Sequence, residues 1–224
     1  MRAGAPSFMS FLSFLSSPTS PTNSEGFIPP HGGYRKLLSY QKALIVFRGT
    51  AFFVKRWLPR YGDRTVDQMV QAARSGKQNI REGSVASGTS KQSEIHLTNI
   101  ARGSQEELEE DYQDFLITRG LREWPEEHRY SQRLRELNRL PGATYETFRK
   151  GIESDDPEIA ANVLLGLVRV TIALLKRQVA AQEQDFLKHG GIRERMTRAR
   201  LAAREQQRKQ EDRKDKKDTR DRKD

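Results

Sequence analysis

From Tyr34 onwards, the spacing of apolar residues has the period of an α-helix through most of the chain. In the first segment apolar positions recur at intervals of three and four, which predicts one buried stripe on a helix of about 20 residues. The stripe consists of Tyr40, Ala43, Leu44, Phe47, Ala51, Val54 and Leu58. Ile45 and Phe52 fall on the opposite side, and Pro59 and Gly62 end the helix.

Two further helices are predicted on either side of a small polar segment, NIREGSVASGTS, at residues 79–90. The first runs from about Asp63 to Glu82, and Gly83 closes it as a C′ residue. Its inward residues are Val66, Met69, Val70, Ala73 and Ile80. The next helix has two candidate N-caps, either Thr89 with Gln92 or Ser90 with Ser93 and Glu94. It continues to Leu121 through Leu97, Ile100, Ala101, Ser104, Leu108, Tyr112, Phe115 and Leu116.

The remaining elements are also helical. Pro125 is predicted at the first turn of a short helix that reaches Leu140, followed by a turn and a brief helical piece at 141–151. The pair Asp156-Pro157 opens a long helix that Gly190-Gly191 closes. No stretch alternates with period two for long enough to be a strand. The sequence therefore predicts an all-α fold: an antiparallel four-helix bundle with a helical excursion before the last helix.

The chain divides into three predicted parts. Residues 1–33 are interpreted as a disordered N-terminal extension, because their apolar run is short for a signal peptide and no cleavage site follows it. Residues 34–191 form the bundle. Residues 192–224 are a charged tail with no apolar face, expected as a frayed helix or as disorder. Two interpretations of this tail stay open: a polybasic arm for nucleic acid, or a solubilising segment.

Charge indicates the kind of partner. The formal net charge is +10 and the mean hydropathy is −0.82, a balance that favours an acidic partner, nucleic acid before any other. Residues 192–224 hold 14 Lys/Arg and 8 Asp/Glu, so the tail supplies +6 and the bundle is only mildly basic. The absence of cysteine excludes disulfides, thiolate metal sites and a cysteine nucleophile, and is compatible with the cytoplasm. The apolar run 163–175 is too short to span a bilayer and contains Arg169, so no membrane role is predicted.

Sequence motifs give little support to catalysis or cofactor binding. Gly83 and Gly88 have the glycine spacing of a phosphate-binding loop, but Thr89 stands where that motif needs lysine, and the preceding segment is helical. The four histidines lack ligand spacing, so neither a metal nor a cofactor is predicted. The acids clustered at 106–114 are interpreted as a solvated or salt-bridged helix face, because no histidine follows them at metal-binding spacing. We therefore expect a protein that is not an enzyme.

Basic residues give the clearest functional signal. No acid occurs between Glu25 and Asp63, yet the first helix carries several cations on its outer side, and the second carries a narrow basic stripe. The candidate nucleic-acid contacts are Lys42, Arg48, Lys55, Arg56, Arg60, Arg74, Lys77 and Arg81. Cations beside Phe52 are suited to phosphates and a stacked base. Alternatively, this surface meets the acidic face of the third helix in a neighbouring subunit.

Residues 65–121 resemble a family of bacterial four-helix-bundle proteins. The family includes proteins encoded in intervening sequences of 23S rRNA genes and the accessory variability proteins of diversity-generating retroelements. The residues that carry the resemblance are Asn79, Ile80, Glu82 and Gly83 before the small polar segment, and Ala101, Arg102, Gly103, Ser104, Glu107 and Leu108 after it. These motifs cover about a quarter of the chain. The N-terminal extension, the excursion and the tail depart from the compact family form, and suggest a longer form with a C-terminal suffix region.

The resemblance implies a four-helix protomer that assembles into a cyclic pentamer. It also implies that nucleic acid, and a reverse transcriptase or ribosomal RNA, are partners of the basic exterior. The motif residues have structural roles by this resemblance: Glu82 pairs with Arg102, while Gly103 and Ser104 permit close helix packing. The expected function is a non-enzymatic, oligomeric, cytoplasmic module that binds RNA or DNA. The alternative is a protein-interaction scaffold whose basic faces pair with acidic faces of neighbouring subunits.

Overall fold

A computed structural model describes residues 31–58 and 64–220, and within these ranges the chain is helical with no strand. The all-α prediction is thereby confirmed. A 3-10 turn, η3 (Tyr34–Lys36), comes before the first long helix. The helices are α1 (Leu38–Trp57), α2 (Arg64–Ala86), α3 (Lys91–Thr118), α4 (Arg129–Arg139), α5 (Tyr145–Ile152), α6 (Pro157–His189) and α7 (Ile192–Arg220). The predicted helix end at Pro59 and Gly62, and nearly all of the predicted N-terminal extension, lie outside the described residues.

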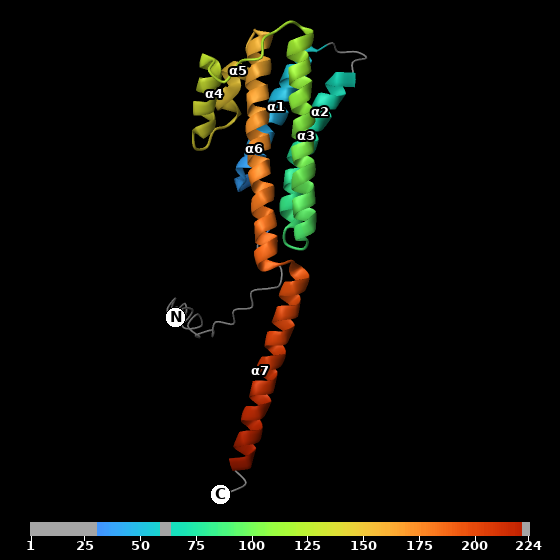
Figure 1. Ribbon diagram of the computed structural model, residues 1–224, viewed down its shortest axis with the longest axis vertical. Coiled ribbons are helices and arrows are strands. Elements are labelled where there is room, and N and C mark those ends of the chain that lie inside the picture. The colour runs from blue at the N-terminus through green and yellow to red at the C-terminus, as the bar shows by residue number, and fades with distance from the viewer. Residues whose placement is uncertain (1–30, 59–63, 221–224) are drawn as a thin grey trace, which may run out of the picture.

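Four long helices form a closed set of contacts: α2 packs against α1 and α3, and α6 packs against the same two helices. Figure 1 shows α1, α2, α3 and α6 running alongside one another, with α4 and α5 on the outer side of α6. The short α5 also contacts α1. Helix α7 leaves the far end of α6 and extends away from all the other helices. We refer to α1–α6 together as the helical body.

An aromatic cluster and a buried amide mark the core. The Phe53 ring lies 5.1 Å from that of Tyr112 and 4.7 Å from that of Phe115, and the Tyr112 hydroxyl shares a 2.9 Å hydrogen bond with Thr50. Gln105 is fully buried, and neither of its amide atoms has a hydrogen-bond partner among the described residues. Such orphaned groups cost free energy, because folding removes them from water without replacing their bonds.

The buried face of α1 is rotated relative to the predicted stripe. Ile45, predicted to face outward, is only 4% exposed, and Phe53 is fully buried, whereas Leu44 and Phe47 lie half-buried at the edge. The reason is the excursion: α5 packs on α1 beside α6, so α1 buries a wider arc than it would in an isolated bundle. The periodicity of the α1 sequence cannot predict that α1 packs against a helix about 100 residues later in the chain.

The segment around Gly83 also differs from the prediction, because α2 continues through it to Ala86. Gly83 is buried inside this helix, and a Cβ there would lie 3.2 Å from the Glu94 carbonyl oxygen of α3. Its function is therefore close helix packing rather than termination. One of the two predicted N-caps is confirmed: the Ser93 backbone N–H donates to the Ser90 hydroxyl at 3.1 Å.

Other helix boundaries show mixed agreement. Asp156 caps α6, with Pro157 in the first turn, and Gly190 ends it with a positive φ of 69°, as predicted. Helix α4 starts at Arg129 rather than at Pro125, and α3 ends at Thr118 instead of Leu121. The brief helical piece at 141–151 is α5, and a capping box formed by Thr144 and Thr147 begins it.

One helical stretch, Pro157–Arg213, contains a window with a mean hydropathy of 1.9, long and apolar enough to cross a membrane by length and composition alone. However, 61% of that window is buried inside the structure. Core helices pass the same test, so this is weak evidence for a membrane span. The side chains that make α6 apolar, such as Leu164 and Leu167, are packed against the other helices.

Candidate nucleic-acid interface

Five of the predicted basic residues lie on the outer sides of the two adjacent helices α1 and α2. We call this surface the α1–α2 basic face: Arg48, Lys55, Arg74, Lys77 and Arg81. Arg48 and Lys55 are seven residues apart on α1, and the other three follow at intervals of three and four on α2, so each set shares one side of its helix. Four of the five are exposed, and Lys77 is half-buried.

One aromatic ring connects the two helices of this face, and a second, in η3, contacts α2. The Lys77 ammonium of α2 lies 4.4 Å from the ring centre of Phe47 of α1, and the Arg81 guanidinium lies 5.9 Å from the Tyr34 ring. Such cation–π contacts place positive charge over rings while leaving the cations open to another ligand. The seam between α1 and α2 therefore presents positive charge and aromatic surface together.

The cations of this face have no carboxylate partner among the described residues. Helix α1 contains no acid. Of the two acids of α2, Asp67 lies seven residues before Arg74 on the same side of the helix, but among the described residues no ion pair joins it to a cation of this face. The other acid, Glu82, accepts a hydrogen bond from Gln78. In the interface between α3 and α6, by contrast, the cations are paired with carboxylates. There Arg169 binds Glu109 at 2.7 Å and Glu123 at 2.8 Å, and Lys176 lies 3.5 Å from Glu106.

Lys42 does not belong to the exposed set, which corrects its predicted outward position. It is 6% exposed, its Nζ donates a 2.8 Å hydrogen bond to Asn138, and it lies 4.8 Å from the ring centre of Phe148. Burial lowers the pKa of this ammonium group below its ordinary value. Asn138 belongs to α4 and Phe148 to α5, so the excursion is what covers Lys42.

The two other predicted contacts are also distinct from the face. Arg56 forms an ion pair with Asp155, just before α6, and its guanidinium lies 5.2 Å from the ring centre of Trp57. A charge already paired with a carboxylate contributes less to phosphate binding. Arg60 lies outside the described residues.

Two of the roles predicted for the motif residues are wrong. Arg102 lies 3.4 Å from Glu106 on its own helix and does not pair with Glu82. A Cβ on Gly103 would meet nothing within 4 Å, so Gly103 is not a packing glycine. The glycine with that function is Gly76, where a Cβ would lie 2.2 Å from the Gln105 Nε2.

The other motif residues join α2 to α3 and to the core. The Ser104 hydroxyl donates a 3.0 Å hydrogen bond to the Ser75 hydroxyl, and the Asn79 amide donates to the Ser75 carbonyl oxygen. Ile80 and Ala101 belong to one small buried cluster, and Leu108 is fully buried in the main core.

Helix α3 carries the acidic surface that the sequence predicted. Glu107, Glu110 and Asp114 are exposed, while Glu106 and Glu109 pair with cations of α6. Burial, together with the neighbouring charges of Asp114, Glu107 and Glu110, raises the pKa of Asp111 from 3.8 to about 6. These acids therefore repel one another, and no cation in the described part of the chain pairs with Asp111.

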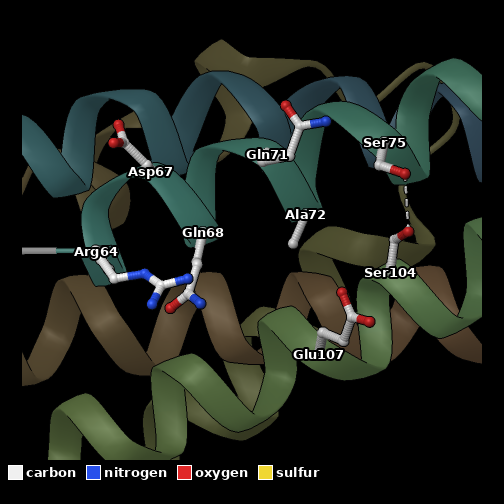
Figure 2. A pocket seen from close by; sticks show the side chains of 8 residues that line it. All are labelled: Arg64, Asp67, Gln68, Gln71, Ala72, Ser75, Ser104 and Glu107. Atoms are coloured by element: carbon white, nitrogen blue, oxygen red, sulfur yellow. Dashed lines mark hydrogen bonds between the residues drawn. The ribbon is translucent and has the colours of Figure 1, made fainter.

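A groove of about 450 Å³ lies between α2 and α3. Figure 2 shows Arg64 and Gln68 side by side on α2, Glu107 extending from α3 toward α2, and the Ser75–Ser104 hydrogen bond at the far end. Its acids are Asp67 and Glu107, and Asp67 points away from α3 in this view. Across the described residues, no group of three His, Cys, Asp or Glu side chains is arranged to hold a metal ion.

Sequence reasoning missed a second basic and aromatic surface on the excursion. In α4 the Arg129 guanidinium lies 4.5 Å from the ring centre of Tyr130, which is 39% exposed. Tyr130 in turn lies beside Trp124 and His128, with ring centres 5.2 and 5.4 Å away. The signal was present in the α4 sequence RYSQRLRELNR, whose cations outnumber its single acid.

No known protein-family model matches this chain, and neither the curated proteins nor the solved structures include a match.

Proposed function

We propose that this protein is a non-enzymatic, oligomeric helical module that binds RNA or DNA through the α1–α2 basic face. The observation that carries the proposal is the set of cations on this face that no described carboxylate neutralises, beside the rings of Phe47 and Tyr34. Unneutralised cations gain free energy when they replace the counterions of a phosphate backbone. Such contacts position the backbone without reading its sequence.

The proposed architecture is an antiparallel four-helix bundle of α1, α2, α3 and α6, with α4 and α5 as the excursion. The contacts of α2 and α6 with the same two helices support this arrangement. Together with the motifs of residues 79–108, it supports the resemblance to the bacterial four-helix-bundle family. On that basis we extend the proposal to a cyclic pentamer in the cytoplasm, an adaptor to a reverse transcriptase or to ribosomal RNA.

The alternative is a protein-interaction scaffold in which the α1–α2 basic face meets the acidic surface of α3 on a neighbouring copy. The raised pKa of Asp111 favours it, because a cation from a second subunit would relieve the repulsion among these acids. Both functions use the same basic residues, and they differ in the partner that is lost when the charges are reversed.

The test reverses two cations of the face, Arg48→Glu with Lys55→Glu, and measures binding of a labelled single-stranded RNA across salt concentrations. We expect affinity to fall about tenfold or more at low salt and the salt slope to decrease by about 2, one for each phosphate contact. The matched control is Arg177→Glu with Lys188→Glu on the exposed side of α6, which makes the same change in net charge.

Light scattering on the same samples separates the two functions. The nucleic-acid proposal predicts an unchanged mass with weakened RNA binding. Loss of the oligomer with unchanged RNA binding supports the scaffold instead. Equal weakening by both variants shows that net charge alone, and not this face, attracts RNA.

A further inference from the structure

Helix α7 has a feature that its composition does not reveal: its acids are confined to one side, whereas its cations occur all round the helix. The helix extends away from the helical body, and its side chains from Arg200 to Arg213 are all exposed. At roughly 100° of rotation per residue, its acids up to that point occupy one side of the helix. These acids are Glu194, Glu205, Glu211 and Asp212.

The opposite side of α7 has no acid over an arc of roughly 200°. We call it the acid-free side: Arg195, Arg198, Ala199, Arg200, Ala203, Lys209 and Arg213. Ala199 and Ala203 lie near its middle, between cations on both edges. If α7 served only as a soluble charged helix, its acids would not need to lie on one side. Acids distributed around the whole helix would stabilise it equally well through i,i+4 ion pairs. Lys209 makes such a pair, 2.7 Å from Glu205.

The start of α7 is fixed to the end of α6. The Gly191 backbone N–H donates to Glu194 at 2.9 Å, and the Arg198 guanidinium donates to the His189 carbonyl oxygen at 2.6 Å. Because Gly190 turns the chain between the two helices, α7 is held as a separate arm that does not fold back on the body. On its acid-free side, Arg198 and Lys209 are engaged in these contacts with His189 and Glu205, while Arg200, Ala203 and Arg213 are exposed.

Double-stranded nucleic acid suits this surface in charge and in dimensions. A duplex carries about one negative charge per 1.7 Å of its axis, and the major groove of DNA is wide enough for an α-helix. The stretch from Ile192 to Arg213 is about 33 Å long, close to one turn of a duplex. Alanines between the cations allow the helix backbone to approach the groove, while the acids on the far side remain in water.

We propose that α7 docks on double-stranded nucleic acid along its acid-free side, as a second contact separate from the α1–α2 basic face. The inference rests on the proposed function, since it names the same class of ligand. It adds a preference: the arm favours a duplex, whereas the face on the body accepts a single strand.

The experiment uses the full chain and a labelled 20-base-pair DNA duplex, with binding followed by fluorescence anisotropy at several salt concentrations. The variant Ala199→Glu with Ala203→Glu places two acids in the middle of the acid-free side. The matched control, Thr197→Glu with Leu201→Glu, makes the same charge change on the opposite, exposed side. Circular dichroism verifies that both variants keep their helix content.

We expect the Ala199/Ala203 variant to lose duplex affinity about tenfold or more, with a much smaller loss for a single strand of the same length. The control should lose less than about threefold. Equal losses in the two variants, or no loss in either, overturn the proposal. A changed mass of the Ala199/Ala203 variant without nucleic acid also overturns it, because the acid-free side would then join two copies of the chain.

Failure of this inference can be told apart from failure of the proposed function. If Arg48→Glu with Lys55→Glu abolishes binding while both α7 variants bind normally, the function stands and α7 has no part in it. If the unmodified protein binds neither the duplex nor the single strand at low salt, both proposals fail together.

Discussion

Gly76 of α2 and Gln105 of α3 face each other in the interface between these helices: a Cβ at residue 76 would lie 2.2 Å from the Gln105 Nε2. A substitution at one position should therefore change the effect on stability of a substitution at the other. Gly76→Ala should destabilise the protein by about 1–2 kcal/mol, because overpacking outweighs the gain of about 1 kcal/mol in helix propensity. In a Gln105→Ala background, the same change should stabilise by about 1 kcal/mol.

A double-mutant cycle measured by chemical denaturation checks this coupling. We expect an interaction free energy of about 2–3 kcal/mol between the two positions. Free energies that add to within about 0.5 kcal/mol would mean that the two side chains do not compete for the same space.

Gln105→Met should raise stability by about 1–2 kcal/mol. Methionine has nearly the volume of glutamine, and it removes two buried polar atoms that have no partner among the described residues. The change appears as a higher denaturation midpoint with an unchanged slope. A lower midpoint would show that the amide is satisfied, by a buried water for instance, and that its removal leaves that partner unpaired.

The two motif glycines of α2 and α3 should respond oppositely to the same substitution. Gly103→Ala adds a methyl group in open space and should stabilise by about 1 kcal/mol, because alanine favours the helix. Gly83→Ala places that methyl group 3.2 Å from the Glu94 carbonyl oxygen, so it should destabilise by about 1 kcal/mol. Thermal unfolding of the pair is a direct comparison, and an equal shift in both would contradict the packing assigned to Gly83.

Asp111 should make stability depend on pH in a defined direction. Its pKa is raised from 3.8 to about 6 in the folded protein, so the folded state holds this proton more tightly than the unfolded chain does. Its contribution to stability is therefore greatest at low pH and is lost as pH rises through about 4–6. Asp111→Asn should match the wild type near pH 4 and exceed it by about 1–2 kcal/mol at pH 7. A constant difference across this range would argue against the raised pKa.

The helical elements could be predicted because periodicity, caps and glycine positions are local properties. Ser90, Asp156 and Gly190 each mark a helix end through their own backbone chemistry. The face of α1 could not be predicted, because Ile45 and Lys42 are buried by helices about 100 residues later in the chain. The predicted helix end at Gly83 was wrong because a buried glycine within a helix and a glycine that follows a helix cannot be distinguished from the sequence alone.

The five residues of the α1–α2 basic face could be predicted from the sequence for similar reasons. Arg74, Lys77 and Arg81 share a side of α2 by spacing alone. The contact of Lys77 with Phe47, the contact of Arg81 with Tyr34 and the ion pair that removes Arg56 from the set depend on distances between elements. Those distances are tertiary information that no single segment contains.

The excursion that buries Lys42 also makes the helical body asymmetric. With α5 packed over one edge of α1 and α2 packed over the other, a large partner would meet the exposed side of α1 between these two helices. The inserted helices thus act as a steric shield. They restrict both a nucleic acid and a neighbouring copy to one direction of approach, and any ring of such subunits must leave room for them at its rim.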